Sequence, residues 1–236
     1  MNQRARIVGG AEAEVNEYPW MALLILIGYQ FCGGSLISSR WIISAAHCTW
    51  GHYEIKGHGT VNLSDPQNFL VSLGDHDITT NNEANHIVRH VSQIFNQPGY
   101  NNFTKINDIS LLKMTQEVDF SVHQHIRPIC LPLNDENSYQ DMMAIATGWG
   151  HIKHEGVGSP VLLEVYLKVL SNNICMEEYH WSEGIITDQM LCAYSNGKDT
   201  CQSDSGKNGN FCYSLLFLLF KEDLSLHEAL KWKTMN

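Results

Sequence analysis

Three short segments of the sequence contain residue types that together activate a serine hydroxyl. The segment SAAHC delivers His47, NDISLL places Asp108 ahead of an apolar run, and CQSDSG places Ser205 in a turn. A serine hydroxyl is a weak nucleophile until a base takes its proton, and imidazole titrates near the working pH. A buried carboxylate holds that imidazole in the required tautomer and stabilises its charged form. Taken singly, each residue also has an ordinary structural explanation, but the chain order His, Asp, Ser is one of the few that builds such a set.

The segments that must position these residues are mostly short and apolar. Runs of four to nine apolar and β-branched residues, separated by Gly, Asn, Asp and Pro, are typical of an all-β sandwich or barrel. We therefore predict one domain of two packed β halves. Two stretches favour helix instead, residues 171–180, with Ser171 or Asn172 as the cap, and residues 221–236. The runs predicted to be β lie at 20–28, 32–48, 68–77, 108–114, 142–150 and 163–170.

Composition restricts the possible partners and the compartment. With 44% hydrophobic and 17% charged residues, the 236-residue chain is globular in type, and its net charge of −10 without a basic run excludes nucleic acid as an expected partner. The longest apolar run, at 211–220, is too short to span a bilayer, so no membrane association is expected.

The cysteines indicate an oxidising compartment. Seven cysteines that do not form C-x-x-C pairs favour disulfides over a zinc site, and the odd count leaves at least one without a partner in the chain. The first residues lack the apolar segment of a signal peptide, so any secretion signal is expected to lie upstream or to have been lost. Two triplets, Asn62-Leu63-Ser64 and Asn102-Phe103-Thr104, match the pattern for N-glycosylation, which is also common by chance.

Residues 6 to about 206 resemble the trypsin-like (chymotrypsin-fold) serine proteases. The matching stretches are RIVGGAEAEVNEYPWMALL, FCGGSLISSRWIISAAHC, NDISLLKM, IRPICLP, ATGWG, MLCAY and KDTCQSDSG. The resemblance implies two orthogonal six-stranded antiparallel β-barrels, with the active site between them. It also implies a secreted, extracellular serine endopeptidase that needs no cofactor and acts on protein or peptide substrates.

Carried over position by position, the family's catalytic residues fall on His47, Asp108 and Ser205. The oxyanion hole falls on the backbone N–H groups of Ser203 and Ser205, which would stabilise charge that develops only in the transition state. Asp199 matches the base of the primary specificity pocket, which implies cleavage after Arg or Lys; a turn residue is the alternative.

The resemblance also implies activation from a zymogen by another protease. Cleavage after Arg6 would free the α-amino group of Ile7, which would then pair with Asp204 and order the oxyanion loop. Protein protease inhibitors are further expected partners. The implied organisation is an activation-peptide remnant at 1–6, a protease domain at 7–206 and a divergent tail at 207–236.

Two disulfides follow from the same resemblance. They are Cys32–Cys48 and Cys175–Cys192, while Cys130 matches a cysteine that often bonds an upstream propeptide and Cys201 one that pairs further along. Some members bind calcium at the position of Asp75, Asp77 and Glu83, whose oxygens suit that ion. A metal-free exposed loop is the simpler interpretation, and no metal is expected.

The chain departs from the family pattern around and after the nucleophile. The family reads Gly-Asp-Ser-Gly-Gly-Pro where this chain has Ser203 in place of the first glycine and Lys207 and Asn208 in place of the last two residues. A glycine tolerates backbone angles and close approach that a side chain resists, so we expect a loss of rate. After Ser205 the chain has no segment that resembles the family's last strands or its terminal helix. We therefore predict an incomplete second barrel in which the apolar run 211–220 adds one substitute strand. The alternatives are a catalytically inactive homologue that binds or acts as a decoy, and a truncated, alternatively spliced or misassigned product.

Overall fold

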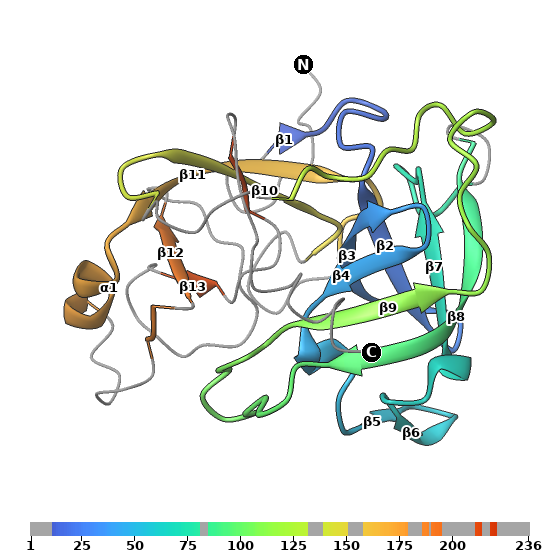
Figure 1. Ribbon diagram of the computed structural model, residues 1–236, viewed down its shortest axis with the longest axis horizontal. Helices are drawn as coiled ribbons and strands as arrows, with labels where there is room; N and C mark the ends of the chain where they lie inside the picture. Colours follow the sequence, from blue (N-terminus) through green and yellow to red (C-terminus); the bar gives the residue numbers. More distant parts are fainter. Residues whose placement is uncertain are drawn as a thin grey trace.

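The computed structural model describes residues 11–80, 85–131, 139–150, 158–178, 186–188 and 190–194, and the backbone of 211–213 and 218–220. Its regular structure is almost entirely β (Figure 1), which confirms the predicted class. The strands are β1 Ala11–Glu12, β2 Met21–Leu26, β3 Tyr29–Ser38, β4 Trp41–Ser44, β5 His52–Ile55, β6 Gly59–Asn62, β7 Phe69–Leu73, β8 Ile87–Asn96, β9 Ser110–Met114, β10 Met143–Gly148, β11 Leu163–Leu170, β12 Leu191–Tyr194, β13 Phe211–Tyr213 and β14 Leu218–Phe220. The other elements are the 3-10 turns η1 Ala46–Cys48 and η2 Pro66–Asn68 and the helix α1 Asn172–Glu178.

Six strands of the N-terminal half close into an antiparallel barrel in the order β2-β3-β4-β9-β8-β7. Alternate residues of a strand face one side, and in β7 the alternate side chains Phe69, Val71 and Leu73 are fully buried inside. Closure pairs the last strand with the first, so the barrel has no exposed strand edge. The barrel is therefore a rigid support for residues at the ends of its strands.

The second half is an open six-stranded sheet rather than a closed barrel in the described part of the chain. Its order is β13-β12-β11-β10-β14, with β1 also pairing with β11. In β11 the alternate residues Leu163, Val165, Leu167 and Val169 are buried, so the strand has one core face. This arrangement agrees with the predicted incomplete barrel.

The apolar run 211–220 contributes two strands, where the sequence predicted one. Strand β13 pairs with β12 through the partners Ala193 and Phe211, and β14 pairs with β10 through Ile145 and Leu219. The two strands lie at opposite ends of the sheet order.

The two halves pack against each other through a shared apolar cluster. Met21 and Leu23 of β2 contact Trp149 and Leu162 of the second half in this cluster. The indole nitrogen of Trp149 donates a 2.8 Å hydrogen bond to the backbone oxygen of His76. The buried contact fixes the second sheet relative to the barrel.

Helix α1 confirms the helix predicted at 171–180. The hydroxyl of Ser171 accepts a 3.3 Å hydrogen bond from the backbone nitrogen of Ile174, so Ser171 is the cap. Asn172 instead donates from its side-chain nitrogen to the backbone oxygens of Thr187 and Met190, each at 3.0 Å. The second predicted helix, at 221–236, lies outside the described residues. None of the helical residues that the structure describes forms a segment long and apolar enough to cross a bilayer.

Candidate active site

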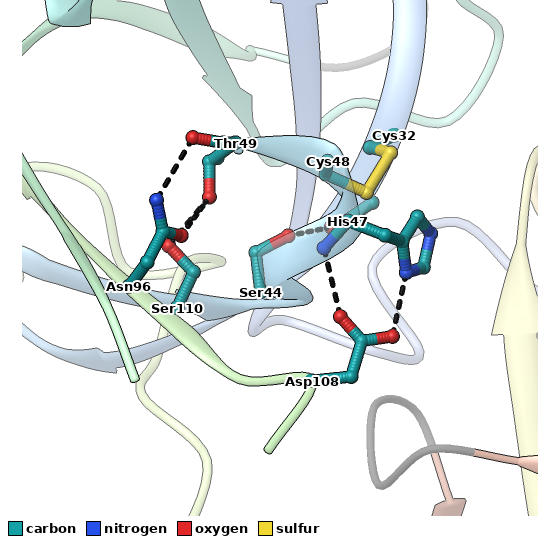
Figure 2. Close-up of a disulfide and its surroundings, with 9 residues drawn as sticks. Cys32, Ser44, His47, Cys48, Thr49, Asn96, Asp108 and Ser110 are labelled. Carbon is teal, nitrogen blue, oxygen red and sulfur yellow. Dashed lines mark hydrogen bonds and ion pairs between the residues drawn. A yellow bond between two sulfur atoms is a disulfide. The ribbon is translucent and has the colours of Figure 1, made fainter. Parts of the chain in front are cut away.

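His47 lies on the short 3-10 turn η1, directly after β4. The neighbours of the histidine in this turn, Ala46 and Cys48, are buried, and Cys48 forms a disulfide with Cys32 of β3 (Figure 2). At the end of β4 the hydroxyl of Ser44 donates a 2.8 Å hydrogen bond to the backbone oxygen of Gly33. The turn is thus fixed on both sides, while the His47 side chain remains 47% exposed.

Asp108 lies two residues before β9 and reaches His47 because β4 pairs with β9. In this pairing Ser44 at the end of β4 lies opposite Ser110 at the start of β9. The Oδ1 atom of Asp108 accepts from the backbone nitrogen of His47, and Oδ2 lies 2.7 Å from Nδ1 of the imidazole (Figure 2). Both bonds are 2.7 Å long, and the carboxylate is 0% exposed.

This geometry fixes the tautomer of the histidine. A carboxylate only accepts hydrogen bonds, so the proton of the neutral imidazole is on Nδ1 and the free lone pair is on Nε2. The second bond, to the backbone nitrogen, orients the carboxylate relative to the ring. The pair therefore presents a directed base next to a buried negative charge.

A second polar network behind the turn was not anticipated from the sequence. The Thr49 hydroxyl donates to Oδ1 of Asn96 at 2.6 Å and lies 2.8 Å from the hydroxyl of Ser110. The side-chain nitrogen of Asn96 returns a 2.9 Å hydrogen bond to the backbone oxygen of Thr49. Thr49 is fully buried, and the network connects the residues after His47 to strands β8 and β9 (Figure 2).

Tyr100 lies beside the pair on the loop between β8 and β9. Burial, and secondly the negative charge of Asp108, raise the pKa of the Tyr100 phenol well above its ordinary value. The phenol therefore stays neutral and donates a 3.1 Å hydrogen bond to Oδ1 of Asn102. Its ring meets the Trp50 ring edge to face at a centroid distance of 5.7 Å.

A pocket of about 360 Å³ opens beside the imidazole. The residues that line it include the aromatic Phe31, Trp50 and Tyr53 and the buried Leu63. The Phe31 and Tyr53 rings also contact each other, with centroids 5.1 Å apart. The pocket gives His47 an accessible and partly aromatic surrounding large enough for a small group.

Most of the other predicted site residues lie outside the described part of the chain. These residues are Arg6, Ile7, Asp199, Ser203, Asp204 and Ser205. The structure thus brings together His47 and Asp108 and leaves their relation to Ser205 as a prediction.

Both predicted disulfides are present. Cys32–Cys48 and Cys175–Cys192 join residues whose Cα atoms are 6.3 and 6.4 Å apart, and the exposed Cys130 has no disulfide partner among the described cysteines. Within the described residues, one group of metal-binding types lies close enough to share an ion: Cys32, His47 and Cys48. Both of its sulfurs are in the disulfide, so it has no thiolate to offer a metal.

The residues considered for calcium have protein partners. Asp75 accepts a 2.8 Å hydrogen bond from the hydroxyl of Ser72, and Asp77 accepts from both the backbone nitrogen and the hydroxyl of Thr79. Glu83 lies outside the described residues. The two described carboxylates therefore take part in local turns.

Comparison with known proteins gives consistent matches. The family model described as Trypsin matches residues 7–207. A venom serine protease of Bombus ignitus, Bi-VSP, is 35% identical over 219 residues, which cover 85% of this chain and 56% of the relative. A venom serine protease of Polistes dominula is 33% identical, over 86% of this chain and 69% of the relative. The serine protease filzig of Drosophila melanogaster is 35% identical, over 85% of this chain and 12% of the relative. The chain thus spans little more than half the length of the first of these relatives.

Proposed function

The chain belongs to the trypsin family of serine proteases, and from this premise we propose that it is a serine endopeptidase with Ser205 as its nucleophile. His47 acts first as base and then as acid, and Asp108 orients it. The observation that carries the proposal is the fully buried Asp108 carboxylate, which holds Nδ1 of His47 at 2.7 Å. A buried charge in this position has a clear use, because it stabilises the imidazolium that forms when a hydroxyl loses its proton.

The proposed reaction has two halves. The Ser205 oxygen attacks the carbonyl carbon of the scissile bond while Nε2 of His47 takes the hydroxyl proton. The N–H groups of Ser203 and Ser205 stabilise the resulting oxyanion. His47 then gives the proton to the leaving amine, and a water molecule hydrolyses the acyl-enzyme with His47 again acting as base.

Specificity and activation follow from the family positions. We assign Asp199 to the base of the substrate pocket, where its charge favours Arg or Lys. We assign cleavage after Arg6 to activation, because the new ammonium group of Ile7 needs a buried partner such as Asp204. The corresponding division is an activation segment at 1–6, a protease domain at 7–206 and a tail at 207–236.

The proposed setting is extracellular. Two disulfides are typical of an oxidising compartment, and two of the relatives are named as venom proteases. Protein or peptide substrates, an activating protease and protein inhibitors are the proposed partners.

A fluorophosphonate probe tests the proposal, because it bonds covalently to an activated serine. The chain cut after Arg6 is expected to be labelled on Ser205, and the uncut chain is not. Ser205→Ala and His47→Ala should remove the label. The matched control is Ser203→Ala, which keeps the backbone N–H and should still be labelled. A folded chain whose N-terminal sequence begins at Ile7, yet which takes no label, would overturn the proposed activity.

A second candidate is an inactive homologue that keeps a binding site without turnover. The observation that favours it is Ser203 where the family has glycine, next to the changed residues Lys207 and Asn208. The same probe distinguishes the two candidates. An inactive chain takes no label, and gain of label in Ser203→Gly would locate the defect in the oxyanion loop.

A further inference from the structure

The sequon Asn102-Phe103-Thr104 lies on the loop between β8 and β9, at the wall of the pocket that contains His47. We propose that Asn102 is an N-glycosylation site and that its glycan stands over this pocket and restricts the approach of large substrates. The inference rests on the proposed extracellular setting, because N-glycans are added in the secretory pathway, and on the proposed protease site.

The Asn102 side chain is oriented for attachment. Its Oδ1 accepts hydrogen bonds from Nζ of Lys105 at 2.9 Å and from the hydroxyl of Tyr100 at 3.1 Å. An ammonium group only donates, so the atom facing it must be the amide oxygen. Within the described residues the amide nitrogen donates no hydrogen bond, and this nitrogen is the atom that carries an N-linked glycan. A glycan can therefore be attached with both hydrogen bonds of the oxygen retained.

The sequon is accessible and its loop is ordered by local bonds. Asn102 is exposed, and Phe103 is 93% exposed. Oδ1 of Asn101 accepts from the backbone nitrogens of Phe103 and Thr104, at 2.9 and 3.1 Å. The backbone nitrogen of Lys105 donates to the backbone oxygen of Asn101 at 2.8 Å. These bonds hold the sequon in one turn, so a glycan on it has a defined origin.

That origin lies on the rim of the pocket. Asn102 lines the pocket together with His47 and Trp50, and Tyr100 connects two of these residues by contacting the Trp50 ring and donating to Asn102. The pocket volume is about 360 Å³, whereas an N-linked oligosaccharide is a bulky surface group. Small substrates can pass beside such a group and reach the pocket, whereas a folded protein would collide with the glycan before it reaches the pocket.

The second sequon provides an internal comparison. Asn62 is exposed at the end of β6, and Oδ1 of this residue accepts from the backbone nitrogen of Ser64 at 2.9 Å. Its neighbour Leu63 lines the pocket and is buried, whereas Asn62 is exposed and is not among the lining residues. A glycan on Asn62 would therefore have the same chemistry, but it would start from a side chain that does not line the pocket.

The test uses the full chain secreted from eukaryotic cells. Glycopeptide mass spectrometry, before and after peptide-N-glycosidase treatment, reads the occupancy of Asn102. Asn102→Gln and Thr104→Val each abolish the sequon, the second while keeping Asn102 in place, and Thr104→Ser keeps the sequon. Asn62→Gln is the matched control at the other site.

We expect Asn102 to be occupied in the unmutated chain and in Thr104→Ser. Hydroxyl-radical labelling of Trp50 should rise at least about twofold in Asn102→Gln and Thr104→Val, and should not change in Asn62→Gln. In cleaved chains, turnover of a folded protein substrate should rise several-fold in the same two variants. Small-ester hydrolysis should be unchanged in Thr104→Val, because Thr104 does not line the pocket.

Two results would overturn the inference. One is a secreted chain with unmodified Asn102, and the other is an occupied Asn102 whose removal leaves Trp50 labelling unchanged. Neither measurement needs turnover. A chain whose Asn102 is glycosylated and shields Trp50, but which shows no protease activity, would refute only the proposed activity. A chain that is active but carries no glycan on Asn102 would refute only the proposed glycosylation.

Discussion

At the scale of single residues, the value of Asp108 lies in its two separate hydrogen bonds to one neighbour. The bond to the backbone nitrogen of His47 sets the direction of the carboxylate, and the bond to Nδ1 sets the tautomer. Because the carboxylate is 0% exposed, water does not compete for either oxygen. Replacing one carboxylate oxygen of Asp108 by an NH₂ group should therefore change the tautomer of His47 while leaving the fold intact.

Asp108→Asn makes that exchange. The amide can still accept one hydrogen bond, but its NH₂ group would donate to Nδ1, which moves the imidazole proton to Nε2 and removes the lone pair that the serine needs. We expect kcat to fall by ~10⁴-fold, the loss that follows from the wrong tautomer in this kind of triad. The measurement is kcat on a small ester or amide substrate after cleavage at Arg6, with thermal unfolding as the check on the fold.

Asp119→Asn is the matched control for this substitution. Asp119 is an exposed carboxylate in a surface turn, where Oδ1 accepts from the hydroxyl of Ser121 at 2.6 Å. Its activity should stay within about twofold of the unmutated chain. An Asp108→Asn enzyme that kept more than a tenth of the original kcat would show that the tautomer is not what Asp108 controls.

At the scale of elements, the site depends on where strands β4 and β9 end and begin. Their pairing puts Ser44 opposite Ser110, and the catalytic pair extends from these two ends. The disulfide from Cys48 to Cys32 and the polar network around Thr49 hold the histidine turn η1, which follows β4. The turn is therefore fixed by contacts to β3, β8 and β9.

Thr49→Val tests how far the network contributes. Valine has nearly the shape of threonine but leaves Asn96 and Ser110 without the buried hydroxyl, which costs about 1–3 kcal/mol. For a chain of this size the melting temperature should fall by roughly 2–12 °C, and kcat should fall because the histidine turn is less fixed. Thr49→Ser keeps the hydroxyl and should retain the kcat of the unmutated chain. A Val variant with the melting temperature of the Ser variant would show that the network adds no stability.

At the scale of the whole molecule, the sequence predicts the features that depend on neighbouring residues better than those that depend on contacts between distant residues. The all-β class, the helix at 171–180 and the buried face of 163–170 follow from short-range periodicity. The contact between His47 and Asp108 was expected from the chain order of the residue types and from the resemblance, because residues 61 positions apart have no local signal of proximity. The Thr49 network had no signal, because it depends on strand register. The run 211–220 contains no Gly, Pro, Asn or Asp to mark two strands, so its division between two partners could not be predicted from the sequence.

Because β13 and β14 pair with the two ends of the second sheet, we expect the tail to stabilise that sheet, and a proline tests this role. Leu219 is the middle residue of β14 and pairs with Ile145 of β10, and a proline there restricts the backbone of this short strand. If β14 covers this edge, Leu219→Pro should weaken the pairing and lower the melting temperature by at least about 2 °C, corresponding to about 1 kcal/mol. Hydrogen exchange at residues 144–146 should become faster, because an uncovered edge opens more readily. Asn208→Pro introduces a proline outside both tail strands and should leave that exchange unchanged. Equal melting temperature and equal exchange at 144–146 in the Leu219→Pro and unmutated chains would mean that the sheet does not depend on this strand.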